Sequence, residues 1–275
     1  RNGVRGWIDL GPLDLQPGEL TKIAFVLVAA DYLRYRSDHR TWGGLLWPAL
    51  ICAVPVGLIF LQPDLGMAML FVPAMFAMLI AAGARLKHMA AIICIALLAV
   101  PVAYPFLKPY QKQRIMAMFA QMRGERRLTE DTAFQAYTAA TITGAGGLTG
   151  YSDAKSRAVV RYSALPERHN DMIFAVVINR FGLLGGLAVM GLYLAWFAGA
   201  ILTAATTREP FGRLVIIGCM AFIAMQVFVN TSMVVGIAPI IGLTLPFVSY
   251  GGSSMLTAWL MTGLIVAVGF RRPPP

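Results

Sequence analysis

Charged residues are scarce in this chain. Asp, Glu, Lys and Arg make up 13% of its 275 residues, about half of the ~25% that is typical of a soluble domain. Apolar residues make up 58%, and the mean hydropathy is +0.68. A chain with so little polar surface cannot face water on all sides, and its apolar character runs from end to end. The composition therefore excludes an ordinary soluble protein and predicts a single membrane domain over residues 1–275.

Cysteine is also scarce. Cys52, Cys94 and Cys219 lie in apolar stretches with no nearby His or second Cys, which excludes a disulfide framework and predicts no metal site. Acidic residues are few as well, 13 against 23 Lys and Arg, so the net charge is +10. Such a charge suits contact with anionic membrane lipids or a phosphorylated substrate. No nucleic-acid partner is expected, because the basic residues are scattered between apolar segments.

Long apolar runs are what the sequence does have. A helix needs about 17–25 apolar residues to cross a bilayer. Seven stretches meet this need and predict an all-α, polytopic transmembrane helical bundle: 17–35, 42–61, 65–83, 88–107, 181–205, 214–235 and 253–270. Basic clusters, which mark cytoplasmic loops, alternate with these spans at residues 34–40, 85–87, 208–213 and 271–272. The segments expected outside are 1–16, 62–64, 236–252 and a large extracytoplasmic loop at about 108–170.

The region 171–205 is too long for one span. It is apolar for about 35 residues, or about 50 Å of helix, so part of it must protrude, re-enter or kink, and Gly182, Gly185 and Gly186 offer a break. Asp171 would then head a helical piece near the outer interface, where low dielectric favours proton uptake and suits a carboxylate to base chemistry. The alternative is that Asp171 only caps the helix.

Polar residues gather on the segments expected outside. Glu19 and Lys22 are three apart and can pair on one helix face, near Trp7. The alternative for this group is an interfacial tryptophan with a snorkelling lysine. Asp64 lies in a tight turn, where it either serves a site or caps the next helix.

Two further outward segments carry polar residues. The long loop holds Lys112, Arg114 and a glycine-rich stretch at 144–147, which is weak evidence of phosphate binding because no strand precedes it. Asn230 lies within a span. The loop that follows offers hydroxyls and backbone amides at a helix start, and it comprises Ser249, Tyr250, Gly251, Gly252 and Ser253. Such a loop either binds an anion or is a plain entry into the helix.

In this order, the segments resemble motifs of the SEDS family of bacterial cell-wall polymerases, at 7–11, 16–22, 62–66, 110–114, 166–176 and 230–254. Residues 110–114 and 166–171 are more similar to the rod-shape, elongation type, RodA, than to the division type, FtsW. Family members have about ten spans, so the resemblance implies that about three are missing at the start of this chain.

The resemblance implies a peptidoglycan glycosyltransferase that polymerises lipid II outside the bacterial cytoplasmic membrane during cell elongation. The implied partners are lipid II, a class B penicillin-binding protein that crosslinks the strands, and other proteins of the elongation complex. Asp171 matches the family's essential aspartate and is the expected general base, and a divalent cation, Mg²⁺ or Mn²⁺, is the one cofactor considered. Residues expected to contact substrate are Trp7, Glu19, Lys22, Asp64, Lys112, Arg114, Asn230, Ser249, Tyr250, Gly251, Gly252 and Ser253.

The chain departs from the family pattern at several positions. Asn179-Arg180 replaces a usual Glu-Glu pair, Thr138-Ala139 a Gln-Ser pair, and Gly18 and Gly6 a Ser and an Arg. Loss of the acidic pair puts in doubt any metal or activation role that the pair serves elsewhere. Two rival functions therefore stay open: a flippase for lipid-linked precursors, and a non-catalytic scaffold of the cell-wall complex.

Overall fold

The structure is a computed structural model that describes residues 6–9, 14–36, 38–62, 64–106, 112, 116, 131–162 and 170–270. The chain divides into two compact units. The first comprises Arg1–Ala96, Ala195–Met225 and Gly251–Pro275, and the second comprises Leu97–Leu194 and Gln226–Tyr250. The prediction of a single membrane domain stays a prediction.

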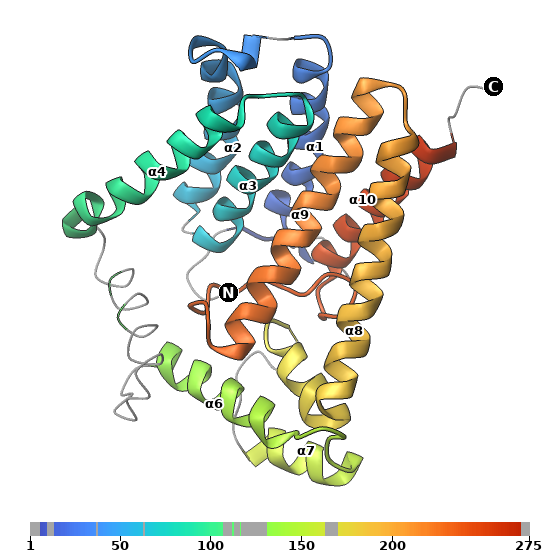
Figure 1. The fold of residues 1–275 in the computed structure, drawn as a ribbon. Coiled ribbons are helices and arrows are strands. Elements are labelled where there is room, and N and C mark those ends of the chain that lie inside the picture. The colour runs from blue at the N-terminus through green and yellow to red at the C-terminus, as the bar shows by residue number, and fades with distance from the viewer. Residues whose placement is uncertain are drawn as a thin grey trace. The chain divides into compact units, whose positions relative to one another are not determined.

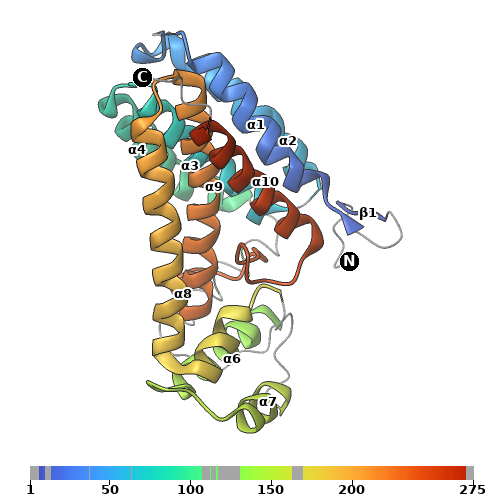
Figure 2. The same ribbon diagram turned by 90° about the vertical axis from the view of Figure 1, so that its right-hand side faces the viewer.

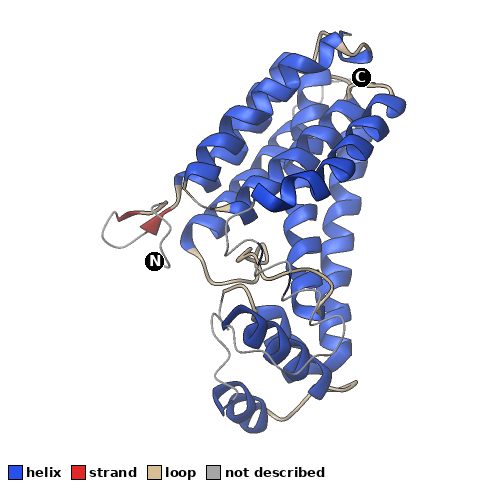
Figure 3. Ribbon diagram, turned by 90° about the vertical axis from the view of Figure 1, so that its left-hand side faces the viewer, coloured by secondary structure: helices blue, strands red, loops and turns tan. Residues whose placement is uncertain are grey.

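Helices make up most of the described chain (Figures 1 and 3). A short antiparallel hairpin at the start pairs β1 (Ile8–Asp9) with β2 (Asp14–Leu15). The helices that follow are α1 (Pro17–Leu33), α2 (Leu46–Leu61), α3 (Leu65–Ala81), α4 (Leu86–Ala103), α6 (Asp131–Ala145), α7 (Asp153–Tyr162), α8 (Ile173–Thr206), α9 (Pro210–Val235) and α10 (Gly252–Phe270). The region expected as one large loop thus contains two helices, α6 and α7.

Each of the seven predicted spans corresponds to a helix. Four helical segments are long and apolar enough to cross a membrane: Gly43–Leu61, which includes α2, together with α8, α9 and α10. Helices α3 and α4 are apolar but shorter by this measure. Helix α1 carries Glu19, Lys22 and Asp31. The polytopic helical fold is confirmed, whereas the number of spans stays a prediction.

Three aromatic rings form the centre of the first unit. Phe25 of α1, Phe71 of α3 and Phe222 of α9 are almost fully buried and meet edge to face, with ring centroids 5.1–5.9 Å apart. Gly218 of α9 lets helices approach closely, because a Cβ there would lie 2.8 Å from the Val26 side chain. Edge-to-face aromatic packing and close helix contact favour this arrangement over a loose apolar cluster.

The basic loops of the first unit lie at the same end of it (Figure 2). His39, after α1, contacts the carbonyl of Ala82, after α3, at 2.9 Å. The guanidinium of Arg34 at the end of α1 lies 5.6 Å from the ring centroid of Phe211, at the start of α9. The loops at 34–40, 85–87 and 208–213 thus lie at one end of the first unit, as alternating spans require, and their cytoplasmic placement stays a prediction. Residues 271–272 lie outside the described part of the chain.

Helix α8 is broken at Gly182, as its length and glycines predict. Gly182 has φ 71° and ψ −171°, a conformation that essentially only glycine adopts. A Cβ at Gly182 would overlap the backbone at Leu148 and Gly150. The amide of Leu183 donates to the Gly147 carbonyl at 2.9 Å. The glycine-rich stretch therefore packs against the break and replaces hydrogen bonds that the helix loses there.

Candidate functional site

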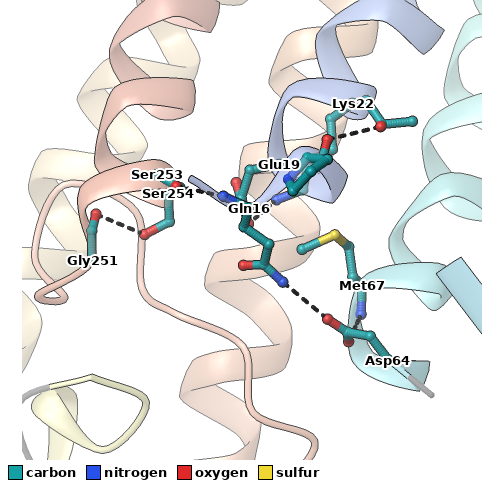
Figure 4. Close-up of polar contacts among 10 residues, drawn as sticks. Gln16, Glu19, Lys22, Asp64, Met67, Gly251, Ser253 and Ser254 are labelled. Atoms are coloured by element: carbon teal, nitrogen blue, oxygen red, sulfur yellow. Dashed lines mark hydrogen bonds and ion pairs between the residues drawn. The ribbon is translucent and has the colours of Figure 1, made fainter. Parts of the chain in front are cut away.

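Each unit carries one polar cluster. The first unit holds the α1 cluster, comprising Gln16, Glu19, Lys22, Asp64 and Ser253 (Figure 4). The second unit holds the Asp171 cluster, comprising Asn170, Asp171, Asn230, Gly242 and Ser249. All ten residues lie within the motifs singled out in the sequence, at 16–22, 62–66, 166–176 and 230–254.

Glu19 and Lys22 form a buried ion pair on α1. Lys22 Nζ donates to Glu19 Oε1 at 2.8 Å, and the two residues are 0% and 4% exposed. The predicted pairing is confirmed. The snorkelling alternative is wrong for Lys22, because its ammonium is enclosed instead of reaching the surface. Removing one partner of such a pair leaves an uncompensated buried charge, which is strongly destabilising.

The other members of the α1 cluster link three segments. Gln16 Nε2 donates to Asp64 Oδ2 at 3.3 Å, and Asp64 Oδ1 accepts from the amide of Met67 at 3.0 Å. Asp64 is thus the N-cap of α3, as one of its two interpretations predicted. The hydroxyl of Ser253 accepts from the backbone N–H of Gln16 at 2.8 Å and donates to the backbone carbonyl of Asp14 at 2.7 Å. The starts of α1, α3 and α10 are therefore joined by hydrogen bonds.

The Gly18 departure has a local explanation. A Cβ on Gly18 would overlap the sulfur of Met67, in the first turn of α3. Gly18 therefore permits the close approach between α1 and α3 that brings Gln16 within reach of Asp64. A serine at this position, as in the usual family pattern, requires Met67 to move.

The Asp171 cluster is organised by two buried side chains. Asn230 of α9 is fully buried, and its Nδ2 donates to the carbonyl of Asp171 at 2.8 Å and to that of Leu243 at 2.6 Å. Ser249 is 2% exposed, and its hydroxyl donates to the carbonyl of Asn170 at 2.7 Å. Consecutive carbonyls just before α8 are thus held from two directions. The backbone at Asp171 is fixed although it precedes the helix.

The carboxylate of Asp171 lies beside a glycine. Asp171 is partly exposed, and a Cβ on Gly242 would lie 3.5 Å from its Oδ2. Gly242 has φ +74°, so the loop turns there in a conformation that other residues rarely adopt. Asp171 immediately precedes a turn that leads into α8. The carboxylate therefore lies close to the turn at Gly242, and the capping alternative stays open.

The loop beside Asp171 is held by contacts that sequence reasoning missed. The hydroxyl of Tyr193, buried in α8, donates to the carbonyl of Pro246. The amide of Ile241 lies 3.1 Å from the sulfur of Met233. No pattern in the sequence distinguishes Tyr193 from an ordinary aromatic residue within an apolar span. Its partner, 53 residues away, was therefore not predictable.

Comparison with known proteins assigns the family. The family model FTSW_RODA_SPOVE, described as "Cell cycle protein", matches residues 1–272. The chain belongs to this family. It is 32% identical, over 98% of its length and 72% of the relative's, to the probable peptidoglycan glycosyltransferase FtsW of Coxiella burnetii. It is likewise 32% identical to the stage V sporulation protein E of Bacillus subtilis, over 98% of this chain and 72% of that protein.

Solved structures agree with the FtsW/RodA/SpoVE assignment. One, described as "Structural coordination of polymerization and crosslinking by a peptidoglycan synthase complex", matches with a TM-score of 0.84 and 31% identity over 100% of this chain and 76% of that one. The rod shape determining protein RodA of Thermus thermophilus matches with a TM-score of 0.67 and 29% identity over 100% of this chain and 72% of that one. The relatives include both division and rod-shape types, so the elongation subtype stays a prediction.

The remaining candidate residues of this FtsW/RodA/SpoVE chain that the structure describes take no part in the hydrogen bonds given for either cluster. Trp7 is 41% exposed on the hairpin, and Tyr250 is 81% exposed just before α10, with Gly251 and Gly252 following it. Lys112 Nζ donates to the Pro105 carbonyl at 2.9 Å. Arg114 lies outside the described residues. Substrate contact by any of these residues stays a prediction.

The described residues do not form a protein cage for a metal ion. In this part of the chain, no group of three or more His, Cys, Asp or Glu side chains lies close enough to hold one. Magnesium often binds through one or two carboxylates together with substrate phosphates. The divalent cation stays a prediction.

Proposed function

We propose that this chain polymerises lipid II into glycan strands on the outer side of the bacterial cytoplasmic membrane, with Asp171 as the general base. Its relative in Coxiella burnetii is named a probable peptidoglycan glycosyltransferase. The solved complex with the TM-score of 0.84 is described as one that coordinates polymerization and crosslinking. Glycosyl transfer is therefore the reaction class that the family supports, and the base, the substrate and the elongation role are the finer proposal.

The reaction needs one base. The acceptor sugar's hydroxyl attacks the anomeric carbon of the donor, the bond from that carbon to the diphosphate oxygen breaks, and the lipid diphosphate leaves with the electron pair. Because diphosphate is already a good leaving group, the second carboxylic acid used in glycoside hydrolysis is not required. A single carboxylate that takes the proton of the attacking hydroxyl is sufficient. Asp171 has the chemistry for this step.

The single observation that carries the proposal is how the backbone of Asp171 is held. Asn230 and Ser249 are buried, and they bind the carbonyls of residues 171 and 170 at 2.8 and 2.7 Å. A base must be held in a narrow range of positions to act, because misplacement by about 1 Å can cost about 10²-fold in rate. Hydrogen bonds from two other segments restrict the main chain at Asp171 in this way.

This geometry gives Asn230 and Ser249 a positioning role. Both hydrogen bonds of the Ser249 hydroxyl go to the backbone, since it also accepts from the Leu245 amide at 2.7 Å. Asn230 Oδ1 is buried with no hydrogen-bond partner among the described residues. Because the whole side chain is enclosed by protein, the contacts of Asn230 support a positioning role, and its contact with substrate stays a prediction.

Positive charge must offset the charge that develops on the departing diphosphate. Lys22 is fully buried, and its charge is already paired with Glu19. A divalent cation that arrives with lipid II would supply the positive charge. A class B penicillin-binding protein is the proposed partner, because it would crosslink the strands that this chain makes.

The test uses the full-length protein with its partner transpeptidase, reconstituted in vesicles that contain lipid II. We expect glycan strands to form, detected by gel separation of labelled products. A flippase would move labelled lipid II across the bilayer and form no polymer, and a scaffold would do neither. Either of those two results, with a correctly folded complex, contradicts the proposed function.

A further inference from the structure

Asn179, in the first segment of α8, is fully buried and uses both ends of its amide. Nδ2 donates to the carbonyl of Ile142 in α6 at 3.0 Å, and Oδ1 accepts from the hydroxyl of Ser156 in α7 at 2.8 Å. One side chain therefore joins α8 to two other helices. An aspartate here would lose the donor to Ile142, and a charge would be enclosed without a cation in contact.

The next residue makes a second link to α7. Arg180 contacts Asp153 Oδ1 at 2.8 Å, and Arg157 contacts Asp153 Oδ2 at 2.8 Å. The Arg157 pair lies within α7, four residues apart. The Arg180 pair joins α7 to α8. The two arginines share one partner, and only the pair with Arg180 connects separate helices.

These links meet at the break in α8. The amide of Tyr151, just before α7, donates to the carbonyl of Asn179 at 3.0 Å. Gly150 and Gly182 face each other so closely that a Cβ on either residue would overlap the backbone of the opposite segment. The segment from Ile173 to the break is thus held at its far end by α6, α7 and the glycine-rich turn, and at its near end by Asn230.

We propose that Asn179, together with Ser156, is a positioning residue that sets the direction of the short α8 segment and so the place of the Asp171 carboxylate. This inference rests on the proposed function, because the quantity that it controls is the rate of polymerisation. Asp171 lies in the turn two residues before α8 begins at Ile173, and Asn179 lies in the helical segment between Ile173 and the break at Gly182. Loosening the far end tilts the segment and moves the base relative to the acceptor hydroxyl.

The test measures kcat and KM for lipid II, per folded enzyme, in the full-length protein with its partner. Asn179→Ala is expected to lower kcat about 10-fold or more and to leave KM nearly unchanged, because the base moves and the lipid-binding surface does not. Ser156→Ala removes only the donor to Oδ1 and is expected to lower kcat by a smaller factor. In the double variant, we expect the Ser156 change to add little, because the two side chains act as one unit.

Arg180→Gln and Arg157→Gln form a matched pair. Each removes one cation from Asp153, but only the Arg180 pair links α8 to α7, because Arg180 lies in α8 and Arg157 lies in α7 itself. We expect Arg180→Gln to lower kcat and Arg157→Gln to leave it unchanged. Equal kcat for wild type, Asn179→Ala and Ser156→Ala, per folded enzyme, would overturn the proposal while the proposed function stands.

Amide hydrogen exchange separates this inference from the proposed function. We expect Asn179→Ala and Ser156→Ala to speed exchange in residues 173–181, whereas Arg157→Gln does not. If the wild type makes no polymer, the proposed function fails, and exchange alone then decides whether Asn179 fixes this segment. If exchange in residues 173–181 is unchanged in both Asn179→Ala and Ser156→Ala, the positioning role of Asn179 is contradicted, whatever the polymerisation rate.

Discussion

Replacing Asn230 with alanine removes the amide that holds the backbone beside Asp171. In the native protein, Nδ2 serves two buried carbonyls, those of Asp171 at 2.8 Å and Leu243 at 2.6 Å. A buried acceptor left without a donor costs about 1–3 kcal/mol. Two such acceptors cost about 2–6 kcal/mol if water does not reach them, and the lower end corresponds to a Tm decrease of roughly 4–8 °C.

The effect on activity follows from the same contacts. Without Asn230, the carbonyl of Asp171 and the loop at Leu243 are no longer held together, so the carboxylate occupies a wider range of positions. A displacement of about 1 Å costs about 10²-fold in rate. We expect the kcat for lipid II polymerisation to fall by about that factor in the variant that remains folded, with a smaller decrease for Ser249→Ala.

Both quantities are measured on the purified full-length complex, by thermal unfolding in detergent and by the polymerisation assay. Thr231→Val is the matched control, because Thr231 is the next residue and its hydroxyl donates to the Val227 carbonyl of its own helix at 2.7 Å. We expect this variant to behave as wild type. If Asn230→Ala shows the Tm and kcat of the control, the positioning role assigned to Asn230 is refuted.

Three further changes test other parts of the structure. Gly18→Ser should lower the free energy of unfolding by about 1–3 kcal/mol, because a Cβ at this position overlaps Met67. Adding Met67→Ala should recover part of the loss, and equal stability of the single and double variants contradicts the explanation. Gly182→Ala should be destabilising by a similar or larger amount, since φ is 71° there, and wild-type Tm would show that the break is not needed. Tyr250→Cys places a thiol at a residue that is 81% exposed, and Cys94→Ser in the same variant removes an exposed native thiol. We expect the new cysteine to react with an impermeant maleimide in intact cells. If it reacts only after lysis, the predicted sidedness is reversed.

Local spacing made part of the structure predictable. Glu19 and Lys22 pair because residues three apart share a helix face, and the structure has them 2.8 Å apart. The break at Gly182 follows from a run too long for one span that contains glycine. Both inferences need only the geometry of one helix, so the sequence alone was sufficient.

Contacts between distant segments were not predictable in the same way. Ser253 was expected either to face an anion or to belong to a plain helix entry, and neither interpretation predicted that its hydroxyl bonds to the backbone of Asp14 and Gln16, more than 230 residues away in sequence. Asn230 was selected because it is polar within an apolar span. That criterion identifies an important residue but not its partner, the carbonyl of Asp171, 59 residues earlier. Periodicity identifies which face of a helix is polar, whereas the packing of helices decides what that face contacts.

The glycine-rich stretch at 144–147 shows the same limit. Its composition suggested, weakly, a phosphate-binding turn. In the structure, this turn packs against the break in α8, and Gly147 accepts from the amide of Leu183 at 2.9 Å. Glycine permits both close approach of a ligand and close approach of backbone, and only the fold distinguishes the two.

The most direct test of the central claim is the polymerisation rate of Asp171→Asn in the full-length protein with its partner. Asparagine keeps the size and the backbone contacts of the aspartate but cannot take a proton from the acceptor hydroxyl. Loss of a general base costs about 10²- to 10⁴-fold, so we expect kcat to fall by that factor with folding and partner binding unchanged. A folded, partner-bound Asp171→Asn enzyme that polymerises lipid II at nearly the wild-type rate would contradict the account.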